Sequence, residues 1–316
     1  MRNDLSLDLP LDQVRTLLAV VDQGTFDAAA AALHVTPSAV SQRVKALEQR
    51  TGRVLLLRTK PVRPTESGEI VVRFARQLAR LERDTRSELG MSGAGEPTRV
   101  TVAVNADSLA TWFLPALARV PREPQLCFEL HREDETRTAE LLREGLVMAA
   151  VTSSPDAVTG CSVHALGTMR YLAAAAPDFV ARHLTDRPLA IGPLSDGPLS
   201  EALSQAPVVV FDRSDDLQDA FVRRLRRGGH GPGAGPVRHA VPTSEGFVDA
   251  VAAGFGWGMV PEMQADALLR AGRLVSLAPD RPLDVPLYWQ QWKLDSPALA
   301  AVADAVTKAA APALRN

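Results

Sequence analysis

The sequence predicts an α/β protein that carries an all-α segment at its N-terminus. Two observations lead to this fold class. Several helical patterns follow each other without strands between them near the N-terminus, whereas strand and helix patterns alternate from Arg99 to the end. The chain has 316 residues, more than a single hydrophobic core usually supports, so we expect two or three compact units.

The N-terminal residues predict three helices joined by tight turns. Leu11 to Gln23 spaces its apolar residues by three and four, as an amphipathic helix does, and an alanine-rich helix covers Phe26 to Leu33. Thr25 caps that second helix, and Thr36 caps a third one that begins at Pro37 and runs to about Gln49. This is the organisation of a helix-turn-helix.

A hairpin and a long helix are expected next. Arg53 to Leu57 and Val62 to Thr65 would pair as a small wing with basic residues at its tip. A helix is predicted from Glu66 to about Leu89, and residues 91–97 form a linker by composition. An apolar seam along the helix would pair two chains, and the alternative is a helix packed only on its own domain. The seam consists of Val71, Phe74, Leu78 and Leu81.

From Arg99 onward the alternating patterns are typical of α/β units. A first lobe is expected to hold strands at 100–104, 126–130 and 147–152, with helices at 107–119 and 136–144. A second lobe is expected to hold strands near 171–175, 208–211, 237–241 and 257–260, with helices at 215–227 and 244–253. A late strand at 287–292 and a helix at 296–311 would return to the first lobe, so that two crossings make a hinged clamshell.

Charge is distributed unevenly, although the formal net charge is only −2. Residues 1–89 contain 14 Lys and Arg against 11 Asp and Glu, and the remainder contains 21 against 26. Between Ser41 and Arg63, Glu48 is the one acid among seven basic residues: Arg43, Lys45, Arg50, Arg53, Arg58, Lys60 and Arg63. This local field suits a polyanion, and a merely solvated charged face is the alternative.

Composition and motifs argue against several classes of protein. No apolar run approaches the roughly 18 residues of a membrane span, and the N-terminus does not resemble a signal peptide, so a cytoplasmic protein with no membrane partner is expected. Two cysteines, Cys127 and Cys161, argue against a disulfide framework, and both are interpreted as small buried hydrophobic residues. The histidines show no metal-ligand spacing, and the glycine-rich segments match no nucleotide-binding loop. We therefore expect no enzyme, no cofactor and no metal.

The third helix separates polar and apolar residues onto two faces. At about 100° per residue, one stripe consists of Ser38, Ser41, Gln42, Lys45 and Gln49, and the opposite one of Val40, Val44 and Leu47. Serine and glutamine hydrogen-bond base edges and phosphates while lysine adds charge, so the polar face is predicted to enter the major groove of DNA. Arg43 lies off this stripe and is assigned to a flanking phosphate or a neighbouring acid.

The stretch from LDQVRTLLAVV to RVLLLRT, followed by RPTESG and the long helix, resembles the winged helix-turn-helix and linker helix of LysR-type transcriptional regulators. The segments AVNADSLATWFLPAL, EDETRT, VVVFDRSDDLQDAF, TSEGFVDAVAAGFGWGMVP and LYWQQW resemble the subgroup that senses lysine and arginine and controls basic amino-acid export (LysG- or ArgP-like). The resemblance implies a DNA-binding domain at 1–65, a dimerising linker helix and hinge at 66–97, and a periplasmic-binding-protein-like effector domain at 98–316. Lobe I would comprise about 98–168 and 279–316, and lobe II about 169–278.

The resemblance also assigns DNA-binding residues. Pro37, Ser38, Ser41 and Gln42 occupy the groove-contacting positions of the family, and Arg58, Lys60 and Arg63 its wing. Thr25, Thr36 and Lys45 complete the predicted DNA-binding set. Many members carry glutamine in place of Pro37 and arginine in place of Gln42, so the base preference is expected to differ. The turn at Leu33-His34-Val35 lacks a glycine, which this family commonly tolerates.

The predicted effector site lies where strands end and helices begin, because ligands bind there in open α/β lobes. Donors for an α-carboxylate are expected at Asn105, Asp107, Ser108, Thr243, Ser244 and Glu245. Acids for an ammonium or guanidinium group follow two strands, namely Asp134 after one and Asp212, Asp215 and Asp216 after the other, with Asp134 and Asp212 preferred. Trp112 would form a wall. The alternatives are simple helix caps at Asp107 and Asp215 and a core position for Trp112.

The sequence thus predicts a LysR-type regulator that binds double-stranded DNA, responds to lysine or arginine and controls a basic amino-acid exporter gene. A homodimer or homotetramer is expected, with RNA polymerase as a further partner. One alternative is an architectural DNA-binding protein whose α/β part only oligomerises and senses nothing. An α/β enzyme with a vestigial head is a more distant alternative.

Overall fold

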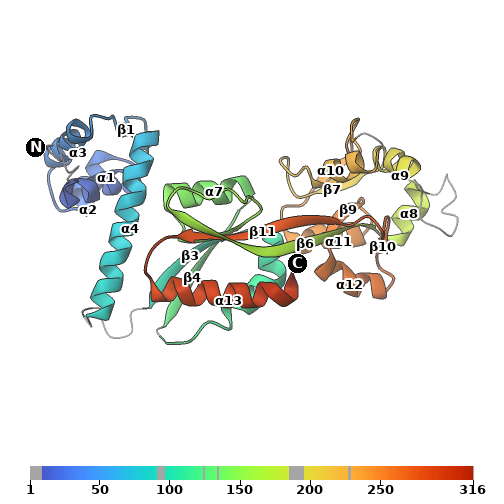
Figure 1. Ribbon diagram of the computed structural model, residues 1–316. Helices are drawn as coiled ribbons and strands as arrows, with labels where there is room; N and C mark the ends of the chain where they lie inside the picture. The colour runs from blue at the N-terminus through green and yellow to red at the C-terminus, as the bar shows by residue number, and fades with distance from the viewer. Residues whose placement is uncertain are drawn as a thin grey trace, which may run out of the picture.

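The computed structural model describes residues 9–89, 91, 97–123, 125–133, 135–184, 196–226 and 229–315. A small helical head lies at one end, the long helix α4 (Glu66–Glu88) leads away from it, and an elongated α/β body makes up the rest (Figure 1). Among the described residues, no helix is both long and apolar enough to cross a membrane.

The head consists of α1 (Leu11–Gln23), α2 (Phe26–Ala32) and α3 (Pro37–Thr51). Thr25 and Thr36 cap α2 and α3, because their hydroxyl oxygens accept hydrogen bonds from the third backbone N–H after them, at 3.1 and 3.2 Å. Apolar side chains from the helices and the hairpin meet in one core. The prediction of a helix-turn-helix is confirmed.

The turn between α2 and α3 holds His34 in the left-handed region, at φ 54°. A side chain costs roughly 1–2 kcal/mol there, whereas glycine costs roughly 0.5–1 kcal/mol in unfolded-state entropy. We therefore expect His34→Gly to raise the free energy of unfolding of the head by up to about 1 kcal/mol, measured by urea denaturation. His34→Ala, which keeps a Cβ, should bring no gain, and a glycine variant less stable than the alanine variant would contradict the strain.

The wing is a short antiparallel hairpin of β1 (Leu56–Leu57) and β2 (Arg63–Pro64). Gly68 lets α4 begin directly against it, because a Cβ at this position would lie 1.9 Å from the carbonyl oxygen of Leu55. The predicted wing is therefore present and is fixed to the start of the linker helix.

The apolar seam of α4 differs from the predicted one. Val71 is buried in the core of the head and is not available to a second chain. Of the other predicted members, Phe74 and Leu81 are exposed and Leu78 is half-buried. Ile70 is exposed as well, and its spacing of four residues from Phe74, which is seven from Leu81, places these three on one side of the helix. We call these three residues the linker stripe. The prediction that Val71 belongs to the seam was wrong because the first turns of α4 are part of the head.

Within the described residues, a seven-stranded sheet runs through the body in the order β10-β6-β11-β5-β3-β4, with β9 paired to β6 as well. The strands are β3 (Thr98–Val104), β4 (Leu126–Arg132), β5 (Ala149–Thr152), β6 (Cys161–Ala175), β9 (Gly258–Pro261), β10 (Val275–Ser276) and β11 (Leu283–Trp292). β3 pairs in parallel with β4 and β5, whereas β11 pairs antiparallel with β5 and β6. The expected return of the late strand to the first lobe is thus observed.

We call the part built on β3, β4 and β5 lobe I. Its helices are α5 (Ala106–Ser108), α6 (Leu114–Leu117), α7 (Glu135–Glu144) and α13 (Pro297–Ala313), and a π-helical turn, η1 (Leu109–Phe113), lies between α5 and α6. α7 covers one face of the sheet, and α13 with α6 the other (Figure 1). The single helix predicted at 107–119 is therefore three consecutive pieces with different hydrogen-bond patterns.

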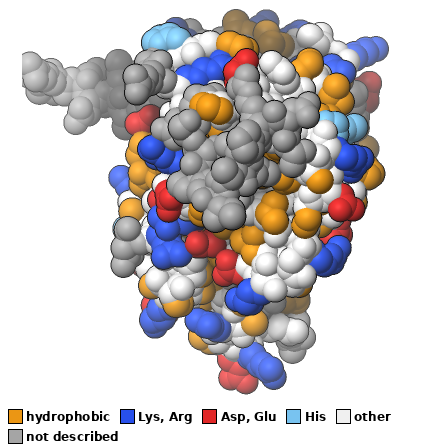
Figure 2. All heavy atoms as spheres, turned by 90° about the vertical axis from the view of Figure 1, so that its right-hand side faces the viewer, with side chains coloured by type: hydrophobic (Ala, Val, Ile, Leu, Met, Phe, Trp, Pro, Cys, Tyr) orange, Lys and Arg blue, Asp and Glu red, His pale blue; other side chains and the backbone are white. Residues whose placement is uncertain are grey.

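Lobe II contains the parallel pair β7 (Val208–Val210) and β8 (Arg238–Ala240), joined to β9 by a bridge between Val208 and Trp257. Its helices are α8 (Pro177–His183), α9 (Asp196–Leu203), α10 (Leu217–Arg224), α11 (Ser244–Ala252) and α12 (Glu262–Arg270). The helices α8, α9 and α12 were not predicted. Figure 2 shows the outer end of this lobe, where basic and acidic side chains are intermixed, unlike the basic run of the head.

The two cysteines are free thiols. Cys161 is buried, and burial raises the pKa of its thiol to about 11, whereas Cys127 is only partly buried. The interpretation of both as buried hydrophobes therefore holds for Cys161 alone.

Candidate functional site

One face of α3 packs against the core of the head, and the opposite face is exposed to solvent. Val40, Val44 and Leu47 are at most 1% exposed and belong to the core of the head. The residues predicted to read DNA on this helix are all exposed on the opposite side: Pro37, Ser38, Ser41, Gln42 and Lys45. The Thr36 cap sets where this face begins, and its hydroxyl lies 3.0 Å from that of Ser38.

Arg43 is separated from this face, as its position off the stripe indicated. Its Nε lies 3.8 Å from a carboxylate oxygen of Asp12 on α1, and its Nη1 lies 3.5 Å from the Thr16 hydroxyl. Of the two roles considered for Arg43, the structure shows the contact with a neighbouring acid.

The wing adds exposed positive charge beside α3. Arg58, Lys60 and Arg63 are all exposed, and the guanidinium carbon of Arg58 lies 5.8 Å from the centre of the Phe26 ring. Phe26 is the first residue of α2, directly after the Thr25 cap. The wing cations are therefore held next to the helices that carry the polar face, as a phosphate-binding surface requires.

A second candidate site is a pocket of about 590 Å³ between the lobes, a volume typical of small-molecule sites. Lobe I contributes Asn105, Asp107, Arg132 and Glu133. Lobe II contributes Phe247 and residues from the loop after β7 and the start of α10, namely Phe211, Asp212, Ser214, Asp215, Asp216, Leu217 and Gln218. Of the residues considered for the effector site, Asn105, Asp107, Asp212, Asp215 and Asp216 line this pocket.

Asp107 joins the two lobes. Its Oδ2 accepts a hydrogen bond from the Tyr171 hydroxyl at 2.7 Å, and its Oδ1 accepts one from the Ser244 hydroxyl at 2.6 Å. Burial raises the pKa of this carboxyl, and the two hydroxyl donors oppose the shift. Because both oxygens have donors, Asp107 holds α5 against α11 rather than offering a free carboxylate.

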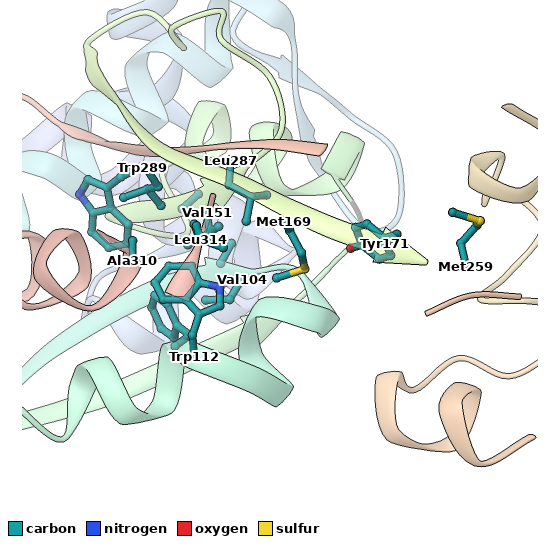
Figure 3. Close-up of a cluster of buried hydrophobic side chains, with 14 of the residues drawn as sticks. Val104, Trp112, Val151, Met169, Tyr171, Met259, Leu287, Trp289, Ala310 and Leu314 are labelled. Atoms are coloured by element: carbon teal, nitrogen blue, oxygen red, sulfur yellow. The ribbon is translucent and has the colours of Figure 1, made fainter. Parts of the chain in front are cut away.

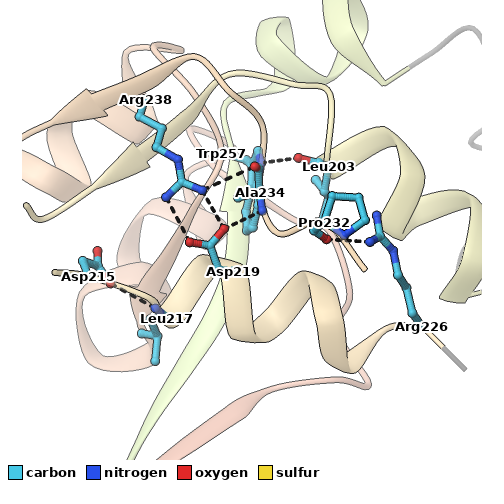
Figure 4. Close-up of polar contacts among 9 residues, drawn as sticks. All are labelled: Leu203, Asp215, Leu217, Asp219, Arg226, Pro232, Ala234, Arg238 and Trp257. Carbon is cyan, nitrogen blue, oxygen red and sulfur yellow. Dashed lines mark hydrogen bonds and ion pairs between the residues drawn. The ribbon is translucent and has the colours of Figure 1, made fainter. Parts of the chain in front are cut away.

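The carboxylates of Asp212 and Asp215 are used by their own loop. Asp212 accepts from the N–H and hydroxyl of Ser214, and these bonds lower its pKa. Asp215 accepts from the N–H of Phe211 at 2.7 Å and of Leu217 at 3.1 Å, while burial raises its pKa (Figure 4). Both residues line the edge of the pocket. Asp215 also accepts from the first backbone N–H of α10, at Leu217, which is close to the helix-cap role considered for it.

Asp219, in the first turn of α10, stabilises the structure of lobe II. Its carboxylate forms a two-bond ion pair with Arg238, at 2.6 and 3.0 Å, and accepts from the N–H of Ala234 at 2.7 Å (Figure 4). The acids that follow β7 are therefore divided between local structure and the pocket.

Three further pocket residues carry charge. Asp216 and Glu133 line the pocket. Within the described part of the chain no side-chain hydrogen bond or ion pair is found for Asp216, whereas the charge of Glu133 contributes to raising the pKa of the nearby Arg137 guanidinium. Arg132 donates to the carbonyl of Pro242 at 2.8 Å, and its guanidinium carbon lies 6.0 Å from the centre of the Phe211 ring. Sequence analysis did not select Arg132 or Glu133, although both sit at the end of a predicted strand.

The other predicted effector residues lie elsewhere. Trp112 is 3% exposed and belongs to the same core as Val104 and Trp289 (Figure 3), so of the two positions considered for it the core position is observed and not the pocket wall. Ser108 is fully buried, and Thr243 caps α11 by accepting from Gly246 N. Ser244 reaches the site only through Asp107, Glu245 is exposed outside the pocket lining, and Asp134 lies outside the described residues.

Comparison with known proteins gives this two-site architecture a family. Residues 11–69 match the model of the bacterial regulatory helix-turn-helix protein, lysR family, and residues 93–311 match the model of the LysR substrate binding domain. The chain belongs to the LysR family. It is therefore a LysR-type transcriptional regulator and not an enzyme, with a DNA-binding head and a two-lobed α/β effector domain, and the resemblance noted in the sequence is confirmed.

The similar LysR proteins include named amino-acid regulators. The chain is 47% identical to the HTH-type transcriptional regulator LysG of Mycobacterium tuberculosis (strain ATCC 25618 / H37Rv), over 99% of this chain and 97% of that one. It is 43% identical to the lysine export transcriptional regulatory protein LysG of Corynebacterium glutamicum, over 96% and 98%. The crystal structure of ArgP from Mycobacterium tuberculosis superposes with a TM-score of 0.84, at 46% identity over 96% and 98% of the two chains. Full-length LysG from Corynebacterium glutamicum with bound effector Arg gives 0.82, at 41% identity over 97% and 100%.

Proposed function

We propose that this regulator binds a basic amino acid, arginine or lysine, in the interlobe pocket, and that the bound effector changes its action at the promoter of a basic amino-acid exporter gene. The observation that carries the proposal is a pocket lined by the carboxylates of Asp216 and Glu133 together with the guanidinium of Arg132. The relatives named for lysine export and the LysG structure with bound Arg support this choice of effector. Calorimetry on the full chain should detect binding of arginine or lysine, and binding of neither would contradict the proposal.

The charges of the pocket suggest how an amino acid is oriented. Asp216 and Glu133 complement the cationic end of the effector side chain, because a guanidinium or ammonium group donates to carboxylates in short, charge-assisted bonds. Arg132 has N–H groups beyond the one that contacts Pro242, and these complement the α-carboxylate. The proposed effector therefore spans the pocket between charges of opposite sign.

Arg132→Ala is expected to lower the affinity for arginine by about 10-fold, because one charge-assisted contact with the α-carboxylate is lost. The affinity for agmatine, which is arginine without its carboxylate, should change by less than about 3-fold. Calorimetry with both ligands measures the difference, and Arg119→Ala, an exposed site in lobe I, is the matched control. Equal losses for the two ligands would show that Arg132 only holds the lobes together.

We further propose that two chains pair through the linker stripe. Its apolar side chains are exposed on a helix of 23 residues, long enough for a short two-stranded seam. The proposed division of the chain remains 1–65 for DNA binding, 66–97 for the linker and 98–316 for effector binding. Pairing of two heads would present two α3 helices to a pseudo-palindromic operator, and further pairing would give a tetramer.

A further inference from the structure

The helix α7 connects the interlobe pocket with the linker helix. At its N-terminal end, Arg132 and Glu133 line the pocket shortly before the helix begins at Glu135. At its C-terminal end, after ten residues or about 15 Å, it meets α4, beside which it lies in Figure 1. Leu141 and Leu142 are buried and anchor the helix to the core of lobe I.

Two arginines of α4 hold the C-terminal end of α7. Arg73 donates to the carbonyl of Arg143 at 3.5 Å, and Arg76 donates through Nη1 to the carbonyl of Glu144. Cations are favoured at this end of a helix because its last carbonyls are unsatisfied and carry partial negative charge. Gly145 ends α7 at φ 72°, and a Cβ there would lie 3.2 Å from Arg73 Cα, so the two helices approach closely.

Arg76 also reaches the head. Its Nη2 lies 2.7 Å from a carboxylate oxygen of Asp22 near the end of α1, and its side chain is only 16% exposed. One guanidinium therefore contacts the DNA-binding head, belongs to the linker helix and holds the effector domain. Arg80 provides a separate tie between α4 and lobe I through the carbonyl of Arg99, so the loss of Arg76 does not detach the helix.

We propose that α7 conveys the occupancy of the pocket to the head, with Arg76 as the positioning residue that joins them. This inference rests on the proposed function and names its regulatory connection. An effector that binds Arg132 and Glu133 acts directly on the segment that leads into α7. A rigid, core-anchored helix transfers a shift of this segment to its far end, where the forked Arg76 side chain sets the position of the head and linker helix against lobe I.

The test compares operator affinity with and without saturating arginine for the full chain. The wild-type ratio of the two dissociation constants is expected in the range of about 5 to 150. Arg76→Ala should reduce it to within about 2-fold of unity, while calorimetry gives an arginine affinity within about 3-fold of the wild type. Arg76→Lys keeps the charge but not the fork and should also lose most of the coupling. Arg83→Ala removes an exposed charge from the same helix and should keep the wild-type ratio.

The ratio separates coupling from a general loss of DNA binding, because a weakened head lowers both affinities alike. An Arg76→Ala variant that melts with the wild type, binds arginine and keeps the full ratio would overturn the inference but leave the proposed function intact. An Arg83→Ala variant that loses the ratio equally would overturn it too, because the effect would then be one of charge alone. A wild-type chain that binds no arginine would contradict the proposed function itself, and the coupling with it.

Discussion

Replacing two carboxylates of the pocket, by Asp216→Asn together with Glu133→Gln, is expected to lower the affinity for arginine by about 30- to 100-fold. Both changes keep the size of the side chain and remove its negative charge. Each lost charge-assisted hydrogen bond costs about 1–2 kcal/mol in a partly solvated pocket, and the two losses need not add fully. Calorimetry on the full chain measures the change.

Citrulline serves as the control ligand, because it has the shape of arginine without the positive charge. The wild type should prefer arginine strongly, and the double variant should bind the two ligands about equally. The matched control variant, Glu123→Gln with Asp266→Asn, removes the same charge at exposed sites outside the pocket lining and should keep the wild-type affinity. If the double variant still preferred arginine over citrulline as strongly as the wild type does, other groups would have to bind the cation.

A second large effect is expected on the head. Ser41→Ala with Gln42→Ala should weaken binding to the operator by at least about 30-fold, because contacts with base edges contribute about 1–3 kcal/mol each. Affinity for unrelated DNA should change by less than about 3-fold, since the phosphate contacts remain. Fluorescence anisotropy with operator and scrambled duplexes measures both quantities.

Lys60→Ala provides the contrast to this variant. It should weaken binding to both duplexes and lower the slope of log affinity against log salt by about one. Ser41 and Gln42 are exposed and lie outside the core, so the variant with both alanines should have the melting temperature of the wild type. Equal losses on operator and scrambled DNA for that variant would contradict the assignment of this face to base reading.

The head could be predicted from sequence because its signals are local. Thr25 and Thr36 are caps followed by helical patterns, and the apolar positions of α3 repeat every three or four residues. Val71 could not be placed in the same way. Its spacing fits a seam between chains and a core position equally well, and only the packing of α4 on the head decides between them.

The body was predicted less completely, for identifiable reasons. The first ten residues of β6 show no period-two burial, because the strand pairs through a register shift opposite Leu287 and Tyr288 and contains Gly167 at φ 126°. The π-helical turn at Leu109–Phe113 adds one residue to a helical turn within a mostly apolar segment, and nothing in its composition marks the extra residue. The helix α12 begins at Glu262 directly after β9 and lacks a side-chain cap.

The pocket shows what an acid cluster in a sequence leaves open. The rule that ligands bind at strand ends indicated Asp212, Asp215 and Asp216, and all three line the pocket. Which carboxylate accepts hydrogen bonds from backbone N–H groups depends on the exact path of the loop. On this path Asp212 and Asp215 accept such bonds, and the carboxylate of Asp216 is left for a ligand. Arg132 had a recognisable signal, a lone cation at a strand end beside acids. It was missed because donors for an α-carboxylate were expected only where helices begin.

Footprinting of promoter DNA by the full chain, with and without arginine, would show whether a basic amino acid controls how this regulator occupies DNA. We expect protection of one pseudo-palindromic site, with a pattern that changes on adding arginine and stays the same on adding citrulline. Protection with weak sequence preference, steep loss at higher salt and no response to arginine or lysine would contradict it, and would favour an architectural DNA-binding protein.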